Sequence, residues 1–261
     1  METIGHYLDQ MRSASPLVHN ITNFVAMNSM ANVLLSAGAS PAMVHSVEEV
    51  EDFAAISNAL TVNIGTLEPA WVDAMCIAAK QMNSQSKPWV FDPVGVGATK
   101  YRQQTSKQLL ALKPTVIRGN ASEIMALAGL ESSGQGVDGR DSVESAVEAA
   151  RNLARQLGSV VAVTGPTDVV TDGERIVEIP HGSHYMSRVT TLGCSLNGVI
   201  AAFCVGQPSY EATVAAIAYY GIAGETAHNK CQGPGSFWVE FIDALASLSG
   251  DDVTSRSQVK S

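Results

Sequence analysis

The sequence predicts a doubly wound α/β fold with a mainly parallel central sheet covered by helices on both faces. Short runs rich in Val and Ile alternate with longer helical patterns. The short runs lack polar alternation, which indicates strands buried on both faces. A hydrophobic content of 46% over 261 residues supplies a core of the required size. We see no repeat and no linker, and therefore expect one domain spanning residues 1–261.

The first two thirds of the chain alternate helix and strand in a regular order. Each strand run is short and ends near a glycine or a polar residue, as expected where a strand turns into a helix. In order, the predicted elements are a helix in "VAMNSMANVLLSAGA", strands in "MVHS" and "ALTVNIGTL", a helix over 71–82, a strand in "PWVFDPVG" that stops at Asp92, a helix over 101–112, a strand in "TVIRGN", a helix over 122–128 and a strand in "SVVAVTG".

In the last third of the chain, the regular alternation of strand and helix ends. The segment "TDVVTDGERIVEIP" predicts a hairpin with Asp172-Gly173 at its turn. Only helical patterns follow, over 193–205, 210–229 and 237–248, and they form a C-terminal helical segment. Because the tail over 250–261 is polar, we expect it to be disordered.

Composition excludes several classes of partner. A net charge of −9 argues against nucleic acid, whose phosphates repel an acidic protein. The sequence shows neither a signal peptide nor a membrane span, and no C-x-x-C pair, so we expect a cytoplasmic protein with free thiols. His181 and His184 lie in a strand-and-loop pattern that makes a zinc site a poor interpretation. Charged residues make up only 16%, which hints at surface buried between subunits.

Polar residues and glycines stand where the predicted strands end. Ligands of an open α/β sheet bind outside the carboxyl ends of its strands. A carboxylate, a guanidinium, amides and glycines at that edge together outweigh the ordinary interpretation of each as a cap or a turn. They are Asn23, Met43, Gly65, Asp92, Arg118, Gly119, Asn120, Thr164 and Gly165.

Two acidic residues in this set suit a divalent cation. Asp92 and Glu123 follow neighbouring predicted strands, and two such carboxylates would hold Mg²⁺ directly or through water. The alternative is that Asn120 and Glu123 in "GNASE" form a helix capping box, in which the two side chains bind each other's backbone amides. Spacing alone leaves both interpretations open.

Two glycine-rich segments imitate nucleotide motifs. "GQGVDG" over 134–139 follows a helix rather than a strand, so it fails the context of a dinucleotide fingerprint, and we expect a mobile loop. "GVGATK" over 95–100 lacks the spacing of a phosphate-binding loop. It follows Asp92, however, and on that ground belongs near a phosphate.

The segment "RVTTLGCSLNGVIAA" carries the chemistry we consider central. An apolar helix begins at about Gly193, which leaves the backbone amides of residues 191–194 unpaired at its positive end. Such an end binds anions and would stabilise a phosphoryl group in transfer. Cys194 at this position should have a lowered pKa and be partly thiolate. The alternative is that Cys194 is a small buried residue that packs the helix start.

Seven ordered segments make the chain resemble the hydroxyethylthiazole kinase family of ribokinase-like enzymes. They span about residues 16–249, nearly the whole chain. The resemblance implies that ATP, with Mg²⁺, phosphorylates 4-methyl-5-(2-hydroxyethyl)thiazole in thiamine salvage, within homotrimers whose active sites lie between subunits. The segments are "PLVHNITN", "GASPAMVHS", "NIGTL", "DPVGVGA", "RGNASEIMALAG", "VTGPTDVVTDG" and "LGCSLNGVIAAF".

The resemblance also implies a role for each matching residue. Asp92 and Glu123 match the family's metal and phosphate region. Cys194 matches the cysteine that replaces the catalytic aspartate of most ribokinase-like enzymes. The thiazole-pocket positions are Asn23, Val25, Met43 and Gly65, and the ATP positions are Arg118 and Thr164, to which we add the strand-end Asn120.

One departure from the family lies at the helix start. The family reads G-T-G-C where this chain has Thr191, Leu192, Gly193 and Cys194. A β-branched residue resists positive φ, so either the turn does not need it or the loop is re-shaped. Thr191 would also reach the hydroxyethyl arm of the substrate. We therefore expect slower turnover than is usual in the family.

Three other functions compete with this interpretation. One is a kinase of another small vitamin-precursor alcohol, of pyrimidine or pyridoxal type. Another is a catalytically weak protein that binds a nucleotide or thiazole and is impaired by the altered residues 191–194. The last is a nucleotide-dependent dehydratase on the same scaffold.

Overall fold

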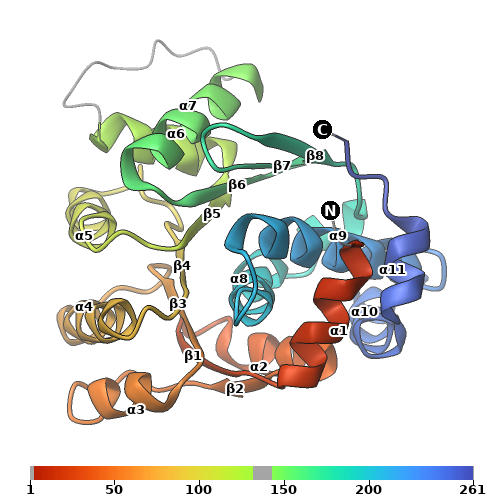
Figure 1. Cartoon of the computed structure of the whole chain (residues 1–261), viewed down its shortest axis with the longest axis horizontal. Coiled ribbons are helices and arrows are strands. Elements are labelled where there is room, and N and C mark those ends of the chain that lie inside the picture. Colours follow the sequence, from red (N-terminus) through yellow and green to blue (C-terminus); the bar gives the residue numbers. More distant parts are fainter. Residues whose placement is uncertain (1–2, 132–142, 261) are drawn as a thin grey trace.

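A computed structural model describes residues 3–131 and 143–260, which build one eight-stranded sheet (Figure 1). The strand order is β2-β1-β3-β4-β5-β6-β7-β8. Neighbours from β2 to β6 are parallel, and β7 and β8 are antiparallel to their neighbours. The strands are β1 (Leu17–Ile21), β2 (Ser40–Ala42), β3 (Ala59–Asn63), β4 (Trp89–Asp92), β5 (Val116–Asn120), β6 (Val160–Thr164), β7 (Asp168–Thr171) and β8 (Ile176–Ile179).

Helices cover both faces of the sheet (Figure 1). The two apolar cores, one on each face, are lined by the alternate residues of the same strands. One face carries α3 (Val50–Ile56), α4 (Pro69–Ser84), α5 (Lys100–Leu110), α6 (Ala121–Glu131) and α7 (Val143–Leu157). The other carries α1 (Ile4–Ala14), α2 (Met27–Ala37), α8 (Leu192–Phe203), α9 (Ser209–His228), α10 (Pro234–Ser247) and α11 (Gly250–Arg256).

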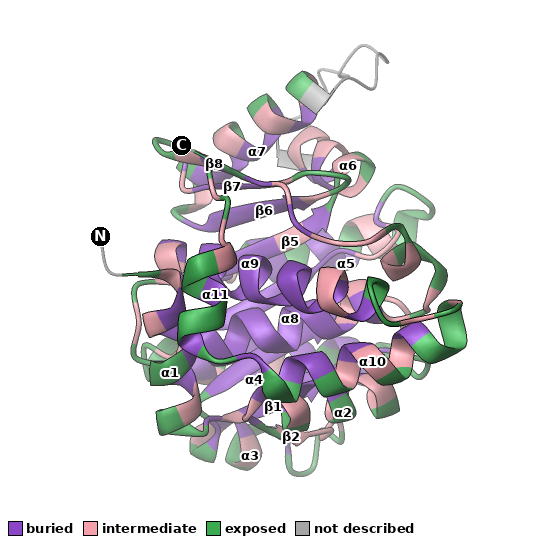
Figure 2. Ribbon diagram, turned by 90° about the vertical axis from the view of Figure 1, so that its right-hand side faces the viewer, coloured by how far each residue is buried: buried purple, intermediate pink, exposed green. Residues whose placement is uncertain are grey.

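The predicted fold class is confirmed, and the central strands are buried as their composition requires. All residues of β3 and β4 are buried. Figure 2 shows buried residues gathered in the middle of the molecule, around α8 and α9. The predicted strand "MVHS" is misplaced, because the edge strand β2 is Ser40–Ala42 and pairs with β1. Pro41 lies within β2, and an edge strand tolerates proline. We did not predict α1, α3 and α7, and the loop over 134–139 lies outside the described residues.

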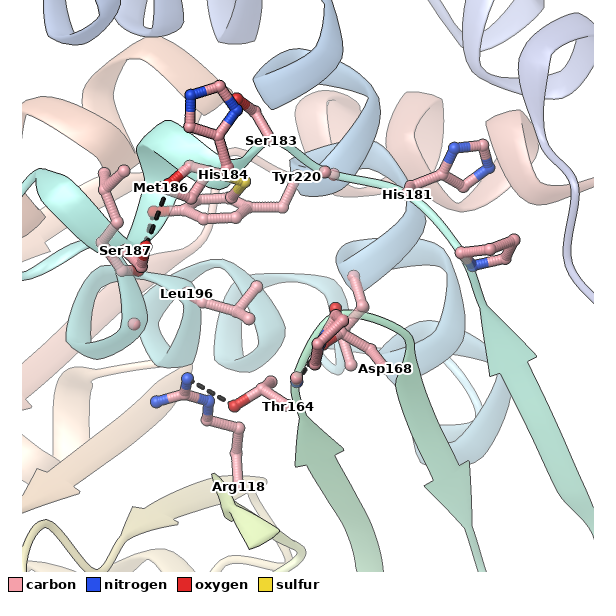
Figure 3. A pocket seen from close by; sticks show the side chains of 18 residues that line it. Arg118, Thr164, Asp168, His181, Ser183, His184, Met186, Ser187, Leu196 and Tyr220 are labelled. Carbon is pink, nitrogen blue, oxygen red and sulfur yellow. Dashed lines mark hydrogen bonds between the residues drawn. The ribbon is translucent and has the colours of Figure 1, made fainter. Parts of the chain in front are cut away.

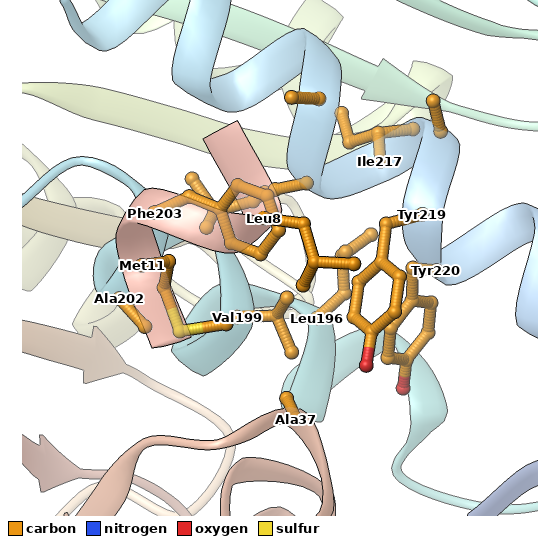
Figure 4. Packing of buried hydrophobic residues seen from close by; sticks show 14 of the residues in the cluster. Leu8, Met11, Ala37, Leu196, Val199, Ala202, Phe203, Ile217, Tyr219 and Tyr220 are labelled. Atoms are coloured by element: carbon orange, nitrogen blue, oxygen red, sulfur yellow. The ribbon is translucent and has the colours of Figure 1, made fainter. Parts of the chain in front are cut away.

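Helix α8 lies at the centre of the second layer and is apolar on nearly every side. It contacts β1, β3, β4, α2 and α9. Leu196, Val199 and Phe203 join side chains of α1 and α9 in one core cluster (Figure 4). Gly198 permits the closest approach to α2, because a Cβ there would lie 3.0 Å from Leu34 Cδ1. Burial on all sides fixes the N-terminus of α8 relative to the strand ends.

The tail differs from the expectation of disorder. Ser249 and Asp252 form a capping box that starts α11, with Ser249 Oγ accepting from Asp252 N at 3.2 Å and Asp252 Oδ2 accepting from Ser249 N at 2.9 Å. Further along, Gln258 N donates to His181 Nε2 at 3.0 Å, and Lys260 forms a bridge with Glu178 of β8. A mostly polar segment is therefore ordered here by specific hydrogen bonds together with the burial of Val253 in the core.

The docking of α11 on α1 depends on two facing glycines. A Cβ on Gly5 would lie 1.8 Å from the carbonyl oxygen of Gly250, which is backbone and cannot yield. Gly5→Ala should therefore lower the free energy of unfolding by about 1–3 kcal/mol, measured by chemical denaturation. Gly235→Ala, where a Cβ meets nothing within 4 Å, is the matched control. Equal stability of the two variants would contradict this account of the tail.

Candidate active site

The carboxyl ends of the parallel strands bring the predicted site residues together. Asp92 is the last residue of β4, Arg118 lies in β5 and Thr164 ends β6. Arg118 spans this edge, because its NH2 donates to Thr164 Oγ1 at 2.7 Å and its NH1 lies 3.8 Å from Asp92 Oδ2. The N-terminus of α8 lies directly above, since a Cβ on Gly193 would be 2.9 Å from Arg118 NH2. Glycine at 193 thus permits the close approach of the guanidinium.

Asp92 is the most buried charge of the site. Its Oδ2 accepts hydrogen bonds from Asn63 Nδ2 at 2.7 Å and from Asn197 Nδ2 at 2.6 Å. Its Oδ1 is buried and has no partner among the described residues. Burial raises the pKa of Asp92 to about 6, and Arg118 acts in the opposite direction. An unsatisfied buried carboxylate oxygen is the feature expected where a cation or a substrate hydrogen completes the site.

A chain of buried amides joins Asp92 to Cys194. Asn23, which follows β1, donates from Nδ2 to Asn63 Oδ1 at 2.9 Å and to Cys194 Sγ at 3.4 Å. Asn63 Nδ2 in turn donates to Asp92 Oδ2. The thiol is therefore held at a defined place beside the carboxylate, and the alternative of a residue that only packs the helix start accounts for none of these contacts.

The predicted ionisation of Cys194 is wrong in direction. Burial raises the pKa of the thiol, and the charge of Asp92 raises it further, while Asn23 and Arg118 act in the opposite direction. The prediction counted the positive helix end but not the neighbouring carboxylate or the depth of the site. Cys194 is consequently a neutral thiol near pH 7.

The N-terminus of α8 presents free backbone amides, as predicted. The first helical hydrogen bond runs from Ser195 N to Thr191 O at 2.8 Å, so the amides of residues 192–194 precede it. No side chain of the described residues caps this end. We call residues 191–194 the mouth of α8. With Arg118 beside it, the mouth has a positive electrostatic character, which favours negative charge.

Thr191 settles one of the alternatives left open by the sequence. It has φ 73° and ψ −5°, the left-handed conformation, although it is β-branched. The turn therefore does need positive φ at this position, and the chain adopts it without glycine. Such a conformation costs about 1–2 kcal/mol.

The capping-box interpretation of Asn120 and Glu123 is confirmed by two hydrogen bonds. Asn120 Oδ1 accepts from Glu123 N at 3.0 Å and Glu123 Oε2 accepts from Asn120 N at 2.9 Å, which is the capping box. Glu123 Oε1 also accepts from Gly95 N at 3.0 Å, so the "GVGATK" segment is tied to the same carboxylate. The charge of Glu123 raises the pKa of Asp92, which places the two carboxylates in electrostatic contact.

A divalent cation fits this pair in a limited way. Among residues 3–131 and 143–260 there is no group of three or more His, Cys, Asp or Glu side chains that could hold a metal ion by itself. Mg²⁺ typically takes one or two carboxylates and completes its shell with water and substrate phosphates. The unpartnered Oδ1 of Asp92 suits that mode of binding.

A cavity of about 710 Å³ opens beside the mouth of α8 (Figure 3). Arg118, Thr164, Leu192 and Gly193 line part of it, and the turn between β6 and β7, the loop after β8 and residues of α9 that include Tyr220 line other parts. This volume is in the range of small-molecule sites. The predicted nucleotide residues Arg118 and Thr164 thus face one cavity, whereas Asn120 is exposed and caps α6.

Of the predicted thiazole-pocket residues, Gly65 and Val25 lie against Asn23. The amide of Gly65 donates to Asn63 Oδ1 at 2.9 Å, and a Cβ at this position would lie 2.9 Å from atoms of Asn23 and Asn63. Val25 is 62% exposed and its amide donates to Asn23 Oδ1 at 3.1 Å. Met43 follows β2 and is half-buried against the core.

The family assignment rests on comparisons that cover nearly the whole chain. The profile described as "Hydroxyethylthiazole kinase family" matches residues 8–251. The chain belongs to this family. It is 57% identical over 253 residues to hydroxyethylthiazole kinase from Cereibacter sphaeroides, covering 97% of each chain. It is 58% identical over 254 residues to the protein of that name from Rhizobium etli, covering 97% of this chain and 98% of the other.

Solved structures agree with the fold. The structure of hydroxyethylthiazole kinase protein from Pyrococcus horikoshii OT3 has a TM-score of 0.92 and 39% identity, covering 98% of each chain. A ribokinase-like superfamily protein from Enterococcus faecalis has a TM-score of 0.67 at 11% identity, covering 94% of this chain and 95% of the other. At that identity the likeness concerns the fold alone, and it supports the ribokinase-like class.

Sequence reasoning missed the residues that hold Asp92. Asn63 is the last residue of β3 and Asn197 lies on α8, one turn after Cys194. Both are polar residues within otherwise apolar buried patterns, which is a usable signal, because a buried amide requires a partner. Tyr220 was also missed, although its hydroxyl donates to Leu192 O at 2.8 Å and so fixes the mouth from the side of α9.

The burial of Asp92 predicts a conflict between stability and function. Its folded pKa of about 6 lies above the ordinary 3.8, so ionisation destabilises the fold as pH rises through this interval. Asp92→Asn should raise the free energy of unfolding by about 1–3 kcal/mol above pH 6, less at lower pH, while abolishing turnover. Urea denaturation at several pH values measures this, with the exposed Asp73→Asn as control. A pH-independent difference would contradict it.

Proposed function

We propose that the protein transfers the terminal phosphoryl group of ATP to the hydroxyl of 4-methyl-5-(2-hydroxyethyl)thiazole, giving ADP and the thiazole phosphate for thiamine salvage. The observation that carries this proposal is the mouth of α8, where unpaired amides meet Arg118 beside the buried Asp92. The family assignment supplies the substrate class. In this proposal ATP occupies the 710 Å³ cavity with its terminal phosphate at the mouth.

The residues of the mouth would act mainly by position and electrostatics. Negative charge that develops on the transferring phosphoryl oxygens meets amides that are already oriented and a guanidinium that is already in place. The thiazole alcohol would lie on the other side, near Asn23 and Gly65, with its hydroxyl toward Cys194 Sγ. Because Cys194 is a neutral thiol, it orients the hydroxyl rather than removing its proton before transfer. A loose transition state makes little demand on a base.

Asp92 and Glu123 are the residues that would hold Mg²⁺ together with the phosphates of ATP. When bound, the ion would neutralise negative charge on the phosphoryl oxygens. The unpartnered Oδ1 of Asp92 supports a direct or water-mediated contact. Because both oxygens of Glu123 already accept backbone amides, contact through water suits Glu123 better.

We further propose a cytoplasmic homotrimer with active sites between subunits. Phe24 and Val25 are 64% and 62% exposed although they adjoin the buried Asn23, and a neighbouring subunit would cover them. The described cysteines form no disulfide, which suits a reducing compartment. None of the described helices has the length and apolarity needed to cross a membrane.

A direct assay tests the proposed reaction. Purified protein with Mg-ATP and the thiazole alcohol should yield equal amounts of ADP and the thiazole phosphate, measured by chromatography and mass spectrometry. Pyridoxal and a hydroxymethylpyrimidine serve as competing alcohols and should react at least about 100-fold more slowly. Binding of the thiazole without any phosphate product would instead indicate a binding protein, and reject the proposal.

Substitution of Cys194 separates orientation from base catalysis. Cys194→Ser should keep turnover within about tenfold of wild type, whereas loss of a true general base costs about 100-fold or more. Cys194→Asp should be tolerated or faster, since a carboxylate accepts a proton more readily than a neutral thiol. Steady-state kinetics measure both, with Cys76→Ser on α4 as the control for removing a thiol elsewhere. Complete loss of turnover in a folded Cys194→Asp protein would count against any role of this side chain in handling the hydroxyl.

A further inference from the structure

The left-handed conformation of Thr191 needs an explanation, because a threonine by itself prefers negative φ. A threonine at φ 73° is maintained only where its surroundings hold it there. It begins α8, and its carbonyl accepts the first helical hydrogen bond from Ser195 N. Any relaxation of Thr191 toward negative φ would therefore rotate the amides of the mouth that follow it.

The side chain of Thr191 is held by a hydroxyl on a different helix. Thr191 Oγ1 forms a short hydrogen bond with Ser29 Oγ of α2. Ser29 Oγ also reaches Ala26 O at 3.1 Å, and Thr191 Oγ1 also reaches Thr190 O. Each hydroxyl has one proton, so one donates to the other and the second donates to a backbone carbonyl. In either arrangement the two hydroxyls are hydrogen-bonded to each other, and this contact joins α2 to the mouth.

Helix α2 is a rigid support for this contact. Leu34, between one and two turns beyond Ser29, is fully buried and lies against Gly198 of α8. The two helices therefore cannot separate without opening the core. From the opposite side, the hydroxyl of Tyr220 holds Leu192 O at 2.8 Å. The mouth is thus fixed between α2 and α9, and Ser29 supplies the contact on the α2 side.

We propose that Ser29 is a positioning residue for phosphoryl transfer, which acts by holding Thr191 in the left-handed conformation that orients the mouth of α8. We call the Ser29–Thr191 hydroxyl pair the clasp. This inference rests on the proposed function and adds to it a residue that touches neither ATP nor the thiazole. It also assigns the clasp as the device by which this chain does without glycine at position 191.

The prediction is a double-substitution cycle. Ser29→Ala should lower kcat about tenfold, which corresponds to the loss of one hydrogen bond, and should change the KM values for ATP and thiazole by less than about twofold. Thr191→Gly removes the need for the clasp, because glycine adopts positive φ without support. In the Thr191→Gly background, Ser29→Ala should then have no effect on kcat.

Two further variants act as controls. Thr191→Val keeps the branched side chain but removes the hydroxyl, so it should be at least as slow as Ser29→Ala. Ser36→Ala removes a hydroxyl from the same helix two turns away and should match wild type. Thermal unfolding gives a readout independent of activity. Ser29→Ala should lower the Tm by about 2–4 °C in wild type and leave it unchanged in the Thr191→Gly background.

The outcomes separate this inference from the proposed function. If the wild type makes the thiazole phosphate but the effects of Ser29→Ala and Thr191→Gly on kcat are additive, the clasp is overturned and the kinase activity is not. The clasp is also overturned if Ser29→Ala lowers kcat/KM by raising KM and leaves kcat unchanged. A wild type that makes no thiazole phosphate rejects the proposed function. The clasp is then tested by the Tm values of the two single variants and the double variant alone, and additive Tm shifts overturn it.

Discussion

The active site depends on the placement of one carboxylate, Asp92, between the parallel sheet and helix α8. Two amides reach the same oxygen of Asp92, one from β3 and one from α8, so the carboxylate joins the two layers. A charge at this depth is unfavourable unless it is paired, and here Arg118 offsets it only in part. An ionisable group whose pKa is shifted by burial in this way is typical of a functional site.

The same burial explains why the thiol at the helix end is not ionised. A helix N-terminus favours a thiolate, but Cys194 lies beside a carboxylate in a site shielded from water. The local negative charge and the lost hydration outweigh the helix end. The charge of Asp92 therefore suppresses the ionisation of Cys194, and Arg118 acts against both shifts. Glycine at residue 193 leaves room for the guanidinium, because a Cβ there would lie 2.9 Å from Arg118 NH2.

Sequence patterns identified the strand ends and the start of α8, because parallel strands and an apolar helix have clear periodicities. They located Asp92, Arg118 and Thr164 correctly in one site. They could not give the pKa of Cys194, which depends on a residue 102 positions earlier in the chain. They also missed Asn63 and Asn197, whose role appears only once β3, β4 and α8 are adjacent. The tail was misjudged because its order comes from a few hydrogen bonds to His181 and Glu178 rather than from composition.

Thr191 shows how a chain can adopt, without glycine, a backbone conformation that favours glycine. The backbone at the mouth is left-handed, as a glycine would allow, yet the residue is one of those that most resist this conformation. A glycine adopts positive φ by itself, whereas a threonine needs a contact with another residue to stabilise this conformation. The requirement is thereby moved from the turn to Ser29 on α2. Precision at the mouth then depends on the packing of α2 against α8, and so on Gly198 and Leu34, which never approach the substrate.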